Sequence, residues 1–231
     1  MLKNEMVAKN PLRALDQSSD GGLLPGQLGL VAARAGTGKT AFLIQVALDS
    51  LFRGNPVLHL SVGETVSHVQ AWYREMFRDL AVGYDLEKAR EVWEEVERNR
   101  FIMTFRVESF SVAKVEERLT DLVEQDIFQP RVVLVDKLDL SADNVREDLE
   151  ALAAFAREKG LKVWVSARTH RGSGDVASFV EPVKDLFQVA VALDPQADAT
   201  IALRVLKNPA GTAGVGPLTL DPRTLLLHTP A

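Results

Sequence analysis

The sequence contains no cysteine, so it excludes disulfides, thiolate metal sites and thiol nucleophiles. Any bound metal must therefore use oxygen or imidazole ligands. The chain has only four histidines, which lie far apart and lack the spacing of zinc ligands: His59, His68, His170 and His228. We interpret them as structural residues and expect no zinc site.

Long apolar runs are also missing, since none approaches the roughly 18 residues that a membrane span needs. This excludes a membrane protein and a membrane partner. Residues 1–11 are largely polar and lack the apolar core of a secretory signal. We expect them to form a flexible tail and expect the protein to be cytoplasmic.

Basic residues are in deficit. Lys and Arg number 27 against 32 Asp and Glu, which gives a net charge of −5. A domain that grips a phosphate backbone usually carries a basic surface. We therefore expect at most weak contact with nucleic acid, although a ring can concentrate a few basic loops in its central channel.

The pattern of elements is that of a single α/β domain covering residues 1–231, a length sufficient for a sizeable core. Apolar and β-branched runs alternate with helical periodicity. The expected strands are 27–33, 56–62, 101–105, 131–135 and 161–167, and the expected helices are 40–52, 65–80, 85–100, 112–125 and 144–159. After about residue 185, strand patterns at 187–193, 199–206 and 217–220 indicate an antiparallel extension of a mostly parallel sheet.

A glycine-rich segment lies between the first expected strand and the first expected helix, where a phosphate-binding loop belongs. Glycines let the backbone fold around the β- and γ-phosphates, consecutive N–H groups and the helix N-terminus supply positive potential, Lys39 neutralises charge, and Thr40 offers a hydroxyl to Mg²⁺. The alternative is a glycine loop that merely joins strand to helix. We predict that ATP with Mg²⁺ binds at Ala35, Gly36, Thr37, Gly38, Lys39, Thr40 and Ala41.

Two carboxylates are candidates for the chemistry of hydrolysis. Asp136 follows the apolar run 132–135, as expected of the Walker B aspartate that holds Mg²⁺ together with Thr40. The alternative reading is a surface turn aspartate such as Asp139 or Asp143. Glu64 follows the strand at 56–62 and is the predicted catalytic base. The alternative role for Glu64 is a first-turn carboxylate that stabilises the next helix.

These motifs resemble those of RecA-like ATPases of the DnaB-type replicative helicases, and also of the KaiC type. Residues 31–40, Val-Ala-Ala-Arg-Ala-Gly-Thr-Gly-Lys-Thr, resemble the DnaB-type P-loop, although Ala33 stands where the usual pattern begins with glycine. Segments 12–26, 60–64, 136–140, 165–168 and 207–212 resemble further family segments in the same order. The resemblance implies the RecA-like P-loop fold, an ATPase activity and an assembly such as a hexameric ring or a complex with a protein partner.

Departures from the family pattern concern coupling and rate. Ala167 replaces the family's coupling glutamine, and Pro209 stands where the arginine finger would be. A finger contributes about 10³ to 10⁵ in rate, so we predict slow hydrolysis and doubt unwinding by this chain alone. Lys207 is the nearest substitute cation and the predicted catalytic one, while Arg204, Arg168 and Arg171 are alternatives.

Related ATPases stack a side chain on adenine soon after the catalytic glutamate. In this chain we expect Tyr73 or Arg74 to contact the base and Trp72 to pack in the core. The sequence thus leaves three functions open. They are an ATPase motor or switch, a nucleotide-binding regulatory protein with little hydrolysis, and DNA binding without catalysis.

Overall fold

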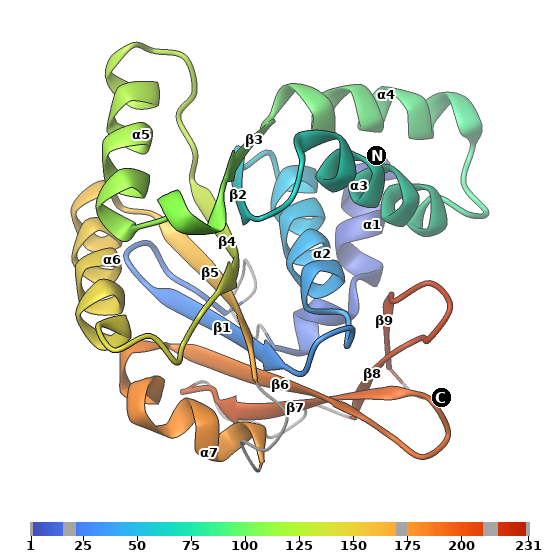
Figure 1. The fold of residues 1–231 in the computed structure, drawn as a ribbon. Coiled ribbons are helices and arrows are strands. Elements are labelled where there is room, and N and C mark those ends of the chain that lie inside the picture. The colour runs from blue at the N-terminus through green and yellow to red at the C-terminus, as the bar shows by residue number, and fades with distance from the viewer. Residues whose placement is uncertain (1, 16–21, 170–174, 210–216, 230–231) are drawn as a thin grey trace.

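A computed structural model describes residues 2–15, 22–169, 175–209 and 217–229. Its centre is a nine-stranded sheet with the order β3-β2-β4-β5-β1-β6-β7-β8-β9 (Figure 1). The strands from β3 to β6 pair in parallel, and β7 to β9 continue the sheet in antiparallel fashion. The prediction of a RecA-like α/β fold with an antiparallel extension is confirmed.

The strand bounds agree closely with the apolar runs of the sequence. They are β1 Leu28–Ala33, β2 Val57–Val62, β3 Arg100–Phe105, β4 Val132–Leu138, β5 Lys162–Arg168, β6 Val189–Pro195, β7 Ile201–Lys207, β8 Leu218–Leu220 and β9 Leu227–His228. All residues of β1 and β2 are buried, including the polar His59 and Ser61 of β2, as expected for central strands that are covered on both faces. The short strand β9 had no sequence signal of its own.

Helices cover both faces of the sheet (Figure 1). One face packs against α1 (Leu2–Lys9), α2 (Lys39–Phe52), α3 (Val66–Leu80) and α4 (Leu86–Arg98), and the other against α5 (Val112–Glu124), α6 (Val145–Lys159) and α7 (Val176–Val180). The 3₁₀ helices are η1 (Pro11–Ala14), η2 (Val107–Ser109) and η3 (Glu181–Leu186). None of the described helices is both long and apolar enough to cross a membrane.

Side-chain caps fix where several helices begin. Thr65, Asp85 and Ser111 accept hydrogen bonds from the backbone N–H groups of His68, Lys88 and Lys114, at the starts of α3, α4 and α5. The helix α2 differs, because its N-cap is Gly38 in a left-handed conformation and no side chain caps it. Its first backbone N–H groups are therefore available to a ligand.

The expectation of a flexible tail was wrong for residues 2–9, which form α1. Leu2 and Met6 are buried, and Lys3 forms an ion pair with Glu95 of α4. The Asn10 side chain also donates a hydrogen bond of 2.9 Å to Asp49 of α2. Two buried apolar side chains at i and i+4 give the segment the helical stripe that its polar composition conceals.

Candidate nucleotide site

The P-loop connects the end of β1 to the start of α2. Gly36 and Gly38 have φ angles of 74° and 89°, a region that favours glycine. A Cβ atom at Gly36 would meet nothing within 4 Å, so the loop opens onto free space there. The Thr37 hydroxyl donates 2.9 Å to the carbonyl of Arg34 and holds the loop closed on itself.

A cavity of about 530 Å³ lies against this loop and is lined by the seven predicted P-loop residues, 35–41. Its other walls include the ends of three further strands, with Val62 of β2, Asp136 of β4 and Arg168 of β5. Ligands of open α/β sheets bind outside the carboxyl ends of the strands, which is where this cavity lies.

Lys39 is buried at the base of the loop. Its Nζ donates to the carbonyl oxygens of Ala33 at 3.2 Å and Arg34 at 2.8 Å. Burial lowers the pKa of Lys39 from 10.5 to about 8, opposed by the charge of Asp136 and reinforced by Arg168 and Lys137. An anion entering the cavity would stabilise the protonated form of the amine.

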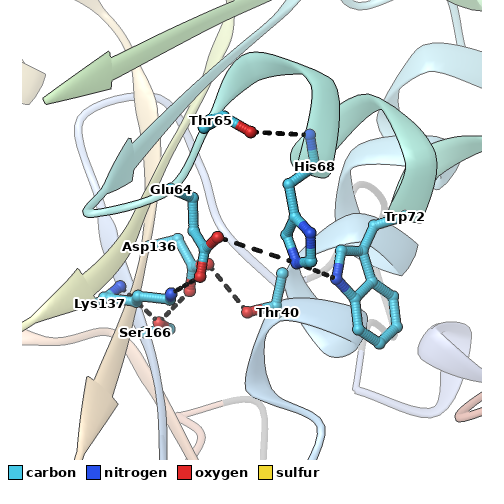
Figure 2. A network of polar contacts seen from close by, with 8 residues as sticks. All are labelled: Thr40, Glu64, Thr65, His68, Trp72, Asp136, Lys137 and Ser166. Atoms are coloured by element: carbon cyan, nitrogen blue, oxygen red, sulfur yellow. Dashed lines mark hydrogen bonds and ion pairs between the residues drawn. The ribbon is translucent and has the colours of Figure 1, made fainter.

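Asp136 is buried beneath the P-loop and joins three elements. One carboxylate oxygen accepts a hydrogen bond of 2.9 Å from the Thr40 hydroxyl on α2, and the other accepts from the Ser166 hydroxyl on β5 (Figure 2). The two predicted metal ligands, Thr40 and Asp136, are thus in contact. By contrast, Asp139 and Asp143 are exposed.

Ser166 was not among the predicted site residues. It donates to Asp136 and accepts 2.9 Å from the backbone N–H of Lys137, so it fixes both residues at the end of β4. The sequence signals were its position at the end of an apolar strand, which a buried packing serine would share, and the resemblance of segment 165–168 to a family segment.

Glu64 follows β2 at the rim of the site and is not among the residues lining the cavity. It forms an ion pair with Lys137, which does line the cavity (Figure 2). The Lys137 ammonium lowers the pKa of Glu64, with a smaller contribution from His68. His68 Nε2 lies 3.8 Å from Glu64 and accepts 3.1 Å from the indole N–H of Trp72.

The expected base contacts need correction. Tyr73 is fully buried and its hydroxyl lies 3.0 Å from Nδ1 of His59, while Arg74 is exposed and lies 3.7 Å from Glu97. Trp72 packs against the core, as expected, and also lines the cavity. The apolar stripe of α3 runs through Val69, Tyr73 and Met76, and therefore turns position 72 toward the P-loop.

Leu225 lines the cavity as well. Gln45 of α2 holds this C-terminal segment, since it donates 3.0 Å to the carbonyl of Leu225 and accepts 2.7 Å from the N–H of Leu227. The cavity therefore has apolar walls beside its polar P-loop end. No sequence signal connected residue 225 with the P-loop.

The predicted substitute finger lies away from this cavity in its own chain. Lys207 donates 3.2 Å to each of the carbonyls of Lys184 and Asp185, and Arg204 pairs with Asp175 and Asp194. Arg168 lines the cavity, and Arg171 lies outside the described residues. Whether Lys207 reaches a neighbouring subunit stays a prediction.

The fold and this site define a P-loop ATPase domain of the RecA-like class. A family model described as "ATPase: KaiC" matches residues 9–180. The chain belongs to this family of KaiC-like ATPases. A search of curated proteins found no match.

Proposed function

We propose that this chain binds ATP with Mg²⁺ in the P-loop cavity and hydrolyses it slowly, as a motor or switch in an oligomer or a partner complex. The observation that carries the proposal is the contact between Thr40 and Asp136 below a loop that holds a buried lysine. A purely connecting loop would not bury a cation and a carboxylate beside an open cavity, because each costs free energy to desolvate.

The oxygens of Thr40 and Asp136 fit Mg²⁺, which binds proteins through one or two carboxylates and takes its remaining ligands from phosphate and water. When bound, the ion would offset the charge of the β- and γ-phosphates. Lys39 would contact the phosphates after leaving its loop carbonyls, and the N–H groups at the start of α2 would donate to phosphate oxygens. Trp72 and Leu225 offer apolar surface for the base and ribose.

Hydrolysis requires a water molecule to attack the γ-phosphorus while the bond to the ADP oxygen breaks. In this proposal Glu64 accepts the proton of that water as general base, a role that contributes about 10² to 10⁴ in rate. Pro209 cannot supply transition-state charge, and Arg204 is already paired within the chain. These features support slow turnover.

The finer resemblance to DnaB-type helicases is part of the proposal. It rests on the P-loop sequence 31–40 and on the segments that follow in the same order. The acidic net charge of −5 supports weak contact with nucleic acid at most. A regulatory protein that binds ATP with little hydrolysis is the second candidate, favoured by the pairing of Glu64 with Lys137.

Two measurements test the proposal. Mg-ATP at about 100 times its Kd should stabilise the folded state by about 2.7 kcal/mol, and Lys39→Ala should abolish the rise in Tm. An unchanged wild-type melting curve at millimolar Mg-ATP would contradict nucleotide binding.

Steady-state phosphate release, with and without single-stranded DNA, separates the two candidates. We expect slow release that Glu64→Gln removes while ATP binding persists. The exposed Glu117 of α5 provides a matched control, since Glu117→Gln removes the same charge far from the proposed chemistry. Release equal in wild type and Glu64→Gln would favour the regulatory reading.

A further inference from the structure

Lys137 adopts an unusual backbone conformation at the edge of the cavity. Its φ is 72°, which costs an L-residue other than glycine roughly 1–2 kcal/mol. The pairing of β4 with β5 shifts register here, between Val135 and Leu138, and the N–H of Lys137 is bound to Ser166 instead of continuing a regular ladder. The conformation is thus held in place by its neighbours, and strain of this kind gathers at functional sites.

The side chain of Lys137 connects the cavity with Glu64. Its ammonium is paired with Glu64 at the end of β2, and the residue itself lines the P-loop cavity. Both side chains are partly exposed, at 41% for Lys137 and 29% for Glu64. Ion pairs this exposed are worth about 0–1 kcal/mol, so the pair can exchange partners at little cost.

We propose that Lys137 senses the terminal phosphate of a bound nucleoside triphosphate by changing partners. It pairs with Glu64 in the empty site and with the γ-phosphate in the filled one, which leaves Glu64 free to accept a proton from water. This inference rests on the proposed nucleotide binding and adds a role to a residue that the sequence left without one.

The exchange follows from charge. A γ-phosphate presents more negative charge and more acceptor oxygens than one carboxylate, and it would lie in a partly desolvated cavity where each contact is stronger. A nucleoside diphosphate lacks that group, so the Lys137 ammonium should remain paired with Glu64 when a diphosphate is bound. Lys137 should therefore favour triphosphate over diphosphate.

Two other cations line the same cavity, Lys39 and Arg168. Lys39 lies at the base of the loop, where its contacts are loop carbonyls. Within the described part of the chain, Arg168 makes no ion pair with Glu64, so it cannot couple phosphate to the base in the same way. Arg168 could still contact the γ-phosphate directly, so the experiment must distinguish its contribution to triphosphate affinity from that of Lys137.

The test measures affinity, by calorimetry with Mg²⁺, for ADP and for an ATP analogue whose β–γ bridge is an imido group. We expect Lys137→Met to weaken the analogue about tenfold, equivalent to about 1.4 kcal/mol, with ADP affinity changed less than about twofold. Arg168→Met should retain more of the preference for the analogue over ADP than Lys137→Met does. Lys114→Met on the exposed face of α5 should alter neither affinity.

Glu64→Gln adds a second readout. Removing the carboxylate frees Lys137, so analogue affinity should rise, and the rise should vanish in the double variant with Lys137→Met. Parallel losses for both nucleotides in Lys137→Met, or loss of the preference in Arg168→Met alone, would overturn the inference while nucleotide binding stands. Wild-type protein that binds neither nucleotide would overturn the proposed function, and this inference with it.

Discussion

A single methyl group at Gly29 should weaken the sheet beneath the P-loop. Gly29 lies in β1 opposite Trp164 of β5, and a Cβ atom there would lie 2.7 to 2.8 Å from three indole ring atoms. Trp164 is 1% exposed, and its ring packs edge-on against Phe42 of α2 with centroids 5.5 Å apart. The indole has no solvent to move into and is confined by the helix that carries Lys39 and Thr40.

The expected magnitude follows from this confinement. Real Cβ contacts essentially never fall below 3.0 Å, so either the strand or the indole must shift in Gly29→Ala. Overpacking of this kind costs about 1–3 kcal/mol, a large share of the 5–15 kcal/mol by which domains are stable. For a chain of 231 residues the midpoint should fall by roughly 2–10 °C.

Urea unfolding of four proteins checks this reasoning: wild type, Gly29→Ala, Trp164→Leu and the double variant. The cost of Gly29→Ala should be clearly smaller in the Trp164→Leu background, because the ring that the methyl group strikes is gone. A cost below about 0.5 kcal/mol in the wild-type background, or an equal cost in both backgrounds, would refute the assignment of the clash to Trp164.

Three further predictions concern charge and the base. Burial lowers the pKa of Lys39 from 10.5 to about 8, so the charged lysine destabilises the folded state at pH 7 and Lys39→Met should raise the free energy of unfolding there. In urea titrations, the excess stability of the variant over wild type should shrink between about pH 8 and 10.5. An excess that stays constant with pH would contradict this. Burial lowers the pKa of His59 below 6.5, so wild type should lose stability as pH falls below that value, and His59→Gln should lose less in the same titration. Mg-ATP should change the tryptophan fluorescence, and Trp72→Phe should remove most of that change. The same substitution should lower the affinity for ATP, measured by calorimetry, several-fold. An unaltered affinity would show that Trp72 does not contact the base.

The features that could be predicted from the sequence are those encoded by a short, continuous pattern of residues. The apolar run before Asp136 and the glycines before Lys39 indicated both the elements and the chemistry, and the structure brings Thr40 and Asp136 together. The burial of Tyr73, and with it the position of Trp72 at the cavity, could also have been predicted from the sequence. A stripe through positions 69, 73 and 76 buries Tyr73, and only the analogy with related ATPases drew attention away from it.

Other features depend on contacts that no local pattern encodes. The polar residues 2–9 form a helix because α2 and α4 offer Leu2 and Met6 a place to pack, and a lysine in the left-handed region has no sequence signature. The pairing of Lys137 with Glu64 joins residues 73 positions apart. Its existence depends on the neighbouring placement of β2 and β4, which the order of the chain does not give.

Strand order also explains why Ser166 belongs to the site. The strand β5 lies between β4 and β1, so the carboxylate at the end of β4 is one strand removed from the loop that follows β1. Asp136 is joined to the start of α2 by its hydrogen bond with Thr40. Ser166, on the intervening strand β5, is hydrogen-bonded to Asp136 and to the N–H of Lys137. An apolar residue at 166 would leave a buried carboxylate oxygen and a strained backbone N–H without their partner, at a cost of about 1–3 kcal/mol for each buried group. The serine therefore stabilises the contact between β4 and β5 at the edge of the cavity, and these two hydrogen bonds follow from a strand order that the sequence pattern does not give.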